Sequence, residues 1–224
     1  MTGASDAEVI ALLTRYQCPT PFHEVRTRFL GNIASPVLGG SPMEAVKQLW
    51  GGELPEFDSL EAVNELLDVL VAGLWNRLTA HQSSRNPFRL LRFDVVETRE
   101  GLKNFALVRK QELDGFVEGL FGDKEHIDLP ERAHQALGVL AEIRAMLAGA
   151  IDLLDDQSKP AEPDDLKELV RNIQELTIIV EKEINKINLS CKRARSQLLE
   201  QIPATKPSNN RAPAPGLGSH LLSL

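Results

Sequence analysis

The sequence DDLKELVRNIQELTIIVEKEINKINLSCKRARSQLLEQ, residues 164–201, contains neither proline nor glycine, and Pro163 and Pro203 bound it. Small or apolar residues recur in it in alternating steps of four and three, forming one seam: Leu166, Val170, Ile173, Thr177, Val180, Ile184, Ile187, Cys191, Ala194 and Leu198. This heptad repeat is typical of a left-handed coiled coil. We therefore predict one helix of about 35 residues, roughly 50 Å long at 1.5 Å per residue.

A second seam precedes this helix. It consists of Ala133, Leu137, Leu140, Leu147, Ile151 and Leu154, and only Arg144 interrupts it. The polar turn between the two seams, residues 157–163, carries two prolines and would fold the helices back as an antiparallel hairpin. Leu169, Leu176 and Ile179 widen the apolar face of the long helix. The sequence leaves open whether this face packs only within the chain or also on a second chain.

Helix start signals recur upstream, and they stand at Ser5, Thr20-Pro21, Ser41-Pro42, Asp58-Ser59, Glu100 and Leu129-Pro130. Ser41 and Glu44 have the spacing of a capping box. Gly51-Gly52 follows a helical run instead of a strand, so it indicates a helix end and not a phosphate-binding loop.

From Leu60 to Leu78 the apolar spacing predicts one continuous helix. β-branched and aromatic residues come close together only near residues 87–98, where we predict a loop that carries a short strand or hairpin.

These patterns predict an all-α, multi-helix bundle. Residues 1–157 would form a helical domain, and residues 158–202 would add the long helix, which packs on the helix before it. Residues 203–224 are rich in Pro, Ser, Asn and Gly, and we predict a flexible tail there. Its last five residues, His220-Leu221-Leu222-Ser223-Leu224, are an apolar end that could dock on the domain or stay free.

Composition restricts the function classes. The net charge is −7, which argues against general binding to nucleic-acid phosphates. The basic group Lys186, Lys192, Arg193 and Arg195 suits the negative end of a helix dipole and needs no nucleic acid.

The cysteine count and the apolar stretches indicate where the protein is located. The two cysteines, Cys18 and Cys191, are too few for a secreted disulfide framework. No signal-peptide pattern begins the sequence, and no apolar stretch approaches the roughly 20 residues of a membrane span. We expect a cytoplasmic protein without a membrane segment.

Four motifs occur in a familiar order: FLGNIASP at 29–36, LWGGE at 49–53, NRL at 76–78 and LDGFVEGL at 113–120. The order and spacing of these motifs, over roughly residues 8–155, resemble those of the YecA/YgfB-type bacterial proteins. The chain lacks the cysteine-rich zinc tail of some members and an aromatic residue shortly before Gly115. The resemblance implies an α-helical fold with a poorly defined function, and it transfers no catalytic residue.

Independent catalytic signals are weak. Glu131 and His134 have the Glu-x-x-His spacing of di-metal helix bundles, but such a centre needs a second copy and two further carboxylates. No second copy is present, so we predict no catalytic, cofactor-binding or metal-binding residue.

Two function classes remain. The favoured one is a non-enzymatic interaction or regulatory protein that associates through helical surfaces, and the alternative is a metal-assisted enzyme that uses Glu131 and His134. Under the first we expect a homodimer through the long helix, with an unknown protein partner and no nucleic acid. The candidate association surface is Val180, Ile184, Ile187, Cys191 and Leu198.

Overall fold

The computed structural model describes residues 4–37, 40–158 and 162–201. The described residues are helical with irregular connections and contain no strand, so the predicted all-α class is confirmed. The elements are α1 (Asp6–Arg15), α2 (Phe22–Ala34), α3 (Pro42–Gln48), α4 (Leu60–Leu67), the π-helical η1 (Asp68–Trp75), α5 (Asn76–Thr79), α6 (Arg99–Phe121), α7 (Glu131–Asp155) and α8 (Pro163–Gln201). The predicted tail, residues 203–224, lies outside the described residues.

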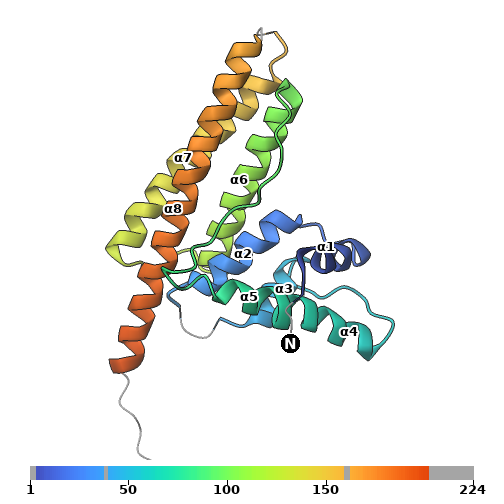
Figure 1. Cartoon of the computed structure of the whole chain (residues 1–224). Helices are drawn as coiled ribbons and strands as arrows, with labels where there is room; N and C mark the ends of the chain where they lie inside the picture. Colours follow the sequence, from blue (N-terminus) through green and yellow to red (C-terminus); the bar gives the residue numbers. More distant parts are fainter. Residues whose placement is uncertain (1–3, 38–39, 159–161, 202–224) are drawn as a thin grey trace, which may run out of the picture.

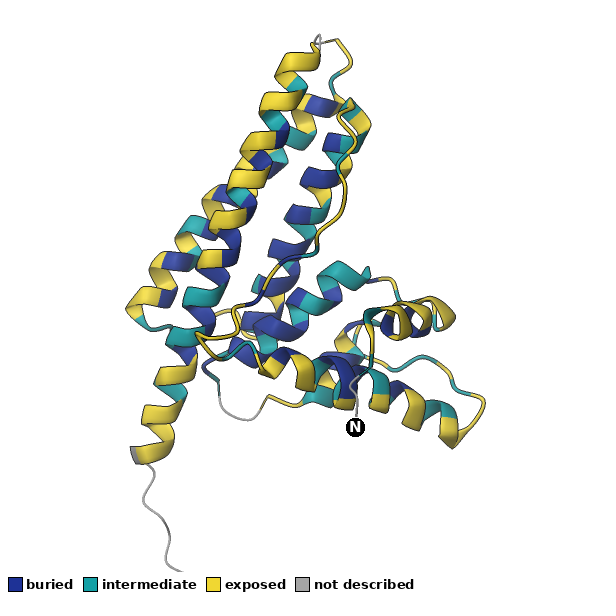
Figure 2. Cartoon of the chain, viewed as in Figure 1, coloured by how far each residue is buried: buried dark blue, intermediate teal, exposed yellow. Residues whose placement is uncertain are grey.

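The three long helices α6, α7 and α8 lie side by side, and the shorter elements gather around α2 at one end of this bundle (Figure 1). α7 and α8 run antiparallel, as the two seams predict. Residues that are buried lie on the inner faces of the three long helices, and exposed residues lie on their outer faces (Figure 2). The last turns of α8 extend past the other helices (Figure 1).

The bundle of long helices and the shorter elements around α2 are joined where α2 and α6 cross closely at three glycines. A Cβ atom on Gly119 would lie 2.0 Å from the backbone oxygen of Arg28, and one on Gly31 would lie 2.2 Å from that of Phe116. Gly115 similarly faces the backbone oxygen of Glu24. Because no larger residue fits, the glycines of the FLGNIASP and LDGFVEGL motifs have a direct packing role.

The helix predicted over 60–78 forms without a break, but its backbone changes type in the middle. Between α4 and α5 the backbone adopts the wider π-helical turn of η1. Leu66, Leu70, Leu74 and Leu78 recur every fourth residue and are all buried. An α-helix turns by 3.6 residues, so strict four-residue spacing drifts around it, and the wider turn corrects this drift.

The strand or hairpin expected near 87–98 is not formed: residues 87–96 are an extended segment without strand pairing. Side chains of α6 and α8 satisfy its backbone instead. Asn185 accepts a hydrogen bond from Phe88 N at 2.8 Å and donates to Phe88 O at 3.0 Å. Glu181 accepts from Leu90 N at 3.1 Å, and Glu112 accepts from Leu91 N at 3.2 Å.

The expected helix caps are confirmed in part. Ser5 forms the reciprocal capping box with Glu8 at the start of α1. Ser41 stands at the N-cap of α3, but its side chain makes no capping hydrogen bond, so the predicted capping box with Glu44 is wrong. The left-handed φ angles of Gly51 and Gly52, +80° and +107°, agree with a helix end.

Candidate interaction surface

Four of the five residues predicted to form the association surface are buried in the core of the protein. Val180, Ile184, Ile187 and Cys191 are at most 1% exposed. They belong to one buried cluster with α7 residues such as Leu140. The chain itself covers this part of the heptad seam, which therefore offers no surface to a second molecule.

Leu198, the fifth predicted residue, lies in the last turns of α8, which project past the other helices, and is 48% exposed. Its neighbour Leu199 is 56% exposed. Leu198 lines a cavity of about 590 Å³ with Ala194 and Gln197 of α8. The other lining residues come from the segments after α2 and before α7: Pro36, Val37, Asp128, Leu129 and Pro130. We call this the α8-end cavity.

The outer face of α8 carries two further exposed aliphatic residues near its middle. Ile178 is 58% exposed and Ile179 is 40% exposed. Glu175 and Lys182, one turn away on either side, are exposed as well. We call these four residues the α8 outer stripe. Ile178 lies off the heptad seam, so the repeat does not identify it, but its exposure on so long a helix is the feature that a partner could use.

Charge is unevenly distributed along α8. Its first turns carry the exposed acids Asp164, Asp165 and Glu168, whereas Lys192, Arg193 and Arg195 lie in its last third and Lys186 lies just before it. Two of these basic residues also form hydrogen bonds to other parts of the chain. Lys192 donates to Gln82 O at 2.8 Å, and Arg195 donates to Ile33 O at 2.8 Å and to Ser35 O.

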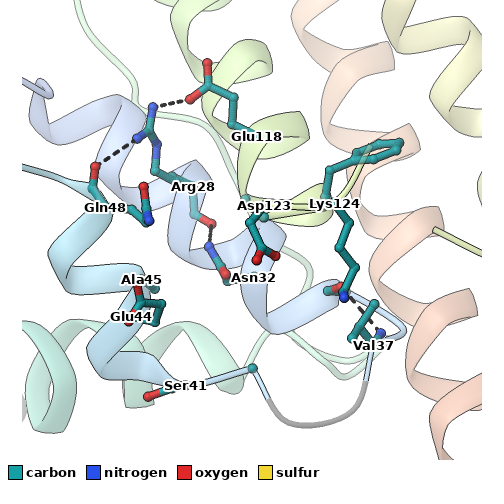
Figure 3. A pocket seen from close by; sticks show the side chains of 15 residues that line it. Arg28, Asn32, Val37, Ser41, Glu44, Ala45, Gln48, Glu118, Asp123 and Lys124 are labelled. Carbon is teal, nitrogen blue, oxygen red and sulfur yellow. Dashed lines mark hydrogen bonds and ion pairs between the residues drawn. The ribbon is translucent and has the colours of Figure 1, made fainter. Parts of the chain in front are cut away.

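A polar groove of about 560 Å³ lies between α2, α3 and the end of α6 (Figure 3). Arg28 extends along it and pairs with Glu118 and, at 2.8 Å, with Glu24. Burial raises the pKa of Glu24, and the Arg28 charge opposes that rise. Two carboxylates therefore already hold the Arg28 guanidinium, although its Nε has no hydrogen-bond partner among the described residues.

The alternative metal site is not assembled. Glu131 and His134 both lie on the exposed face of the first turns of α7. Among residues 4–37, 40–158 and 162–201, no three His, Cys, Asp or Glu side chains come together in a way that could hold a metal ion. The arrangement offers neither the second Glu-x-x-His copy nor the additional carboxylates of a di-metal centre.

Both cysteines are free thiols. Burial raises the pKa of Cys191 to about 11, and it also raises the pKa of the half-buried Cys18. A thiol that stays protonated at neutral pH is a poor nucleophile. Neither residue therefore has the environment of a catalytic cysteine.

Comparison with protein-family models, with curated proteins and with solved structures finds no match. The YecA/YgfB resemblance accordingly stays a prediction that rests on the four motifs. No helix in the described part of the chain has the length and apolar character needed to cross a membrane.

Proposed function

We propose that the protein is a non-enzymatic interaction protein, similar to the YecA/YgfB type, that associates through its long helix and forms a homodimer. The observation that carries the proposal is the exposure of Ile178 and Ile179 on α8 after the core has been filled. Burying a large aliphatic side chain contributes roughly 1.5–3 kcal/mol, so burial of this pair by a partner would stabilise the complex.

Charge complementarity favours a second copy as the partner. In a two-fold, antiparallel pairing centred on Ile178 and Ile179, Glu175 of one copy faces Lys182 of the other, because each stands three residues from the centre. The same pairing brings the acidic first turns of one α8 toward the basic last third of the other. A parallel pairing would bring like charges together.

Replacement of both central isoleucines tests the dimer. We expect wild-type protein at tens of micromolar to have the mass of a dimer by light scattering coupled to size exclusion. The double variant Ile178→Asp, Ile179→Asp should have the mass of a monomer and an unchanged circular dichroism spectrum. The control is Met146→Asp on α7, because Met146 is likewise a large exposed apolar residue, at 56%, but lies off the stripe. A monomeric wild type, or a dimer that survives the double substitution, contradicts the proposal.

A charge exchange tests the antiparallel arrangement. Glu175→Lys alone and Lys182→Glu alone should each weaken the dimer, since each places like charges opposite one another. The double exchange should restore it, because both intermolecular pairs are re-formed with reversed sign. If the double exchange weakens association as much as the two single changes combined, the antiparallel pairing is wrong.

We place this activity in the cytoplasm, since two free thiols suit a reducing compartment. An enzymatic role through Glu131 and His134 has no observation in its favour, because the two side chains are exposed and no group of residues in the described part of the chain could hold a metal ion with them.

A further inference from the structure

The α8-end cavity differs from the rest of the surface because apolar residues of three separate segments form its walls. Pro36 and Val37 follow α2, Leu129 and Pro130 precede α7, and Leu198 belongs to the last turns of α8. Only Asp128 and Gln197 add polar groups to this lining. A cavity of this size and character fits two or three aliphatic side chains better than a charged ligand.

The chain supplies a segment of matching chemistry close by. After Gln201, where the described part of α8 ends, the sequence continues with a Pro- and Asn-rich stretch and then with His220-Leu221-Leu222-Ser223-Leu224. Three leucines within four residues form a compact apolar group. The stretch between, residues 202–219, contains almost no large apolar residue that could compete for the same cavity.

We propose that Leu221, Leu222 and Leu224 dock into the α8-end cavity of the same molecule. The connection is long enough, because a chain of about 20 residues with random-coil dimensions would span roughly 25 Å on average. Leu198 stands three residues before Gln201, which is about 4.5 Å along the helix axis. A tether of this length gives the leucines an effective concentration near the millimolar range at the cavity.

Polar residues at the edge of the cavity can form hydrogen bonds that orient the docked segment. Asp128 is exposed at the cavity, where its carboxylate can accept a hydrogen bond from the His220 ring or from a backbone amide of the docked segment. Gln197 offers both a donor and an acceptor to the same backbone. The docked leucines would cover Leu198, and they would leave the α8 outer stripe free for a second copy.

The test measures competition between the tethered segment and the same segment added as a free peptide. The probe is a fluorescein-labelled peptide of residues 216–224, and its binding to full-length chains is followed by fluorescence anisotropy. Four chains are compared: the wild type, the tail variant Leu221→Asn, Leu222→Asn, Leu224→Asn, and the tail variant with either Leu198→Asn or Leu199→Asn added. Leu199 is the matched control because it is exposed to a similar degree, 56% against 48%, but does not line the cavity.

We expect the tail variant to bind the peptide about tenfold more tightly than the wild type, because its cavity is no longer occupied by a tethered competitor. Leu198→Asn should remove this binding, and Leu199→Asn should leave it unchanged. Equal binding by wild type and tail variant, binding that ignores Leu198, or no binding to any chain overturns the proposal.

The mass of each chain separates docking within one molecule from exchange between two. If replacement of the tail leucines converts a dimer to a monomer, the occupant comes from a second copy and docking within the chain is wrong. Failure of the proposed dimer is recognised separately, since it appears as a monomeric wild type and does not depend on the peptide.

Discussion

Gly119 lies where α6 crosses α2, and the space that a side chain would need is filled by the backbone of Arg28. Gly138 on α7 is also helical, but a Cβ atom there would meet nothing within 4 Å. The two positions separate the packing role of glycine from its backbone entropy. At Gly119 the absence of a side chain is required, whereas at Gly138 it weakens the helix.

The same substitution should consequently have opposite effects at the two sites. Gly119→Ala must push α2 away from α6, and we expect a loss of about 1–3 kcal/mol in the free energy of unfolding. Gly138→Ala should gain up to about 1 kcal/mol, because alanine is the better helix former. Urea denaturation followed by circular dichroism measures both. Similar effects of the two changes would contradict the packing at this crossing.

Cys191 provides a residue-scale prediction on pH. Burial raises its pKa from 9.0 to about 11, so the folded state holds the thiol proton in a range where the unfolded state has lost it. The stability contribution of this thiol is therefore complete below about pH 9 and falls as the pH rises toward about 11.

In a Cys18→Ser variant, Cys191 is the only remaining thiol. At pH 8 it should react with a disulfide reagent only as fast as the protein unfolds, and added urea should raise the rate sharply. The rate of an unfolded control peptide sets the upper limit. Reaction of the folded variant at that limit would show that Cys191 is accessible.

At the scale of elements, α8 and α6 each bind the extended segment 87–96 through one buried carboxylate, Glu181 on α8 and Glu112 on α6, and the two differ in their counter-charges. Glu181 pairs with Arg89 at 2.6 Å and with Arg92 at 3.1 Å, and these two arginine side chains are 61% and 67% exposed. Glu112 pairs with Arg109, whose side chain is only 4% exposed. Burial raises the pKa of Glu112, and the charge of Arg109 opposes that rise.

Removal of the negative charge should cost more at Glu112 than at Glu181. Glu112→Gln leaves the Arg109 charge buried without an anion, and we expect a loss of about 3–5 kcal/mol. Glu181→Gln leaves two arginines that water can reach, so we expect about 1–3 kcal/mol. Chemical denaturation of both variants gives the comparison. Equal losses would mean that Arg109 is hydrated in the folded protein.

The sequence was sufficient for the helices but not for this extended segment. Periodicity of apolar residues predicts α7, α8 and their antiparallel packing because each seam is a local repeat. The strand expected near 87–98 was wrong because its backbone is bound by Asn185, Glu181 and Glu112, which are far away in sequence. A local pattern of β-branched and aromatic residues carries no information about such partners.

The candidate surface was predicted less well for a related reason. The heptad seam identifies the most apolar face of α8, and the chain uses that face for its own core at Val180, Ile184 and Ile187. Which residues remain exposed depends on what α7 and α6 cover. Ile178 and Ile179 could therefore be recognised as a surface pair only once the fold was known.

At the scale of the whole molecule, the long-helix bundle and the helices around α2 are joined twice. The first joint is the glycine crossing of α2 and α6. The second is made by α8, where Asn188 donates to His81 O at 2.9 Å and Lys192 donates to Gln82 O at 2.8 Å. Arg195 adds bonds to Ile33 O and Ser35 O. Two joints on different helices predict that the parts unfold together.

Two spectroscopic signals can test this cooperativity because they report different parts. Both tryptophans, Trp50 and Trp75, lie among the short helices, whereas most of the helical circular dichroism comes from α6, α7 and α8. We expect both signals to change at the same urea concentration in the wild type, as in a two-state transition. Gly119→Ala and Arg195→Ala each weaken one joint, and each should lower both midpoints together as long as the other joint holds. A tryptophan transition that precedes the loss of helicity in the wild type would show that the short helices form a separately unfolding unit.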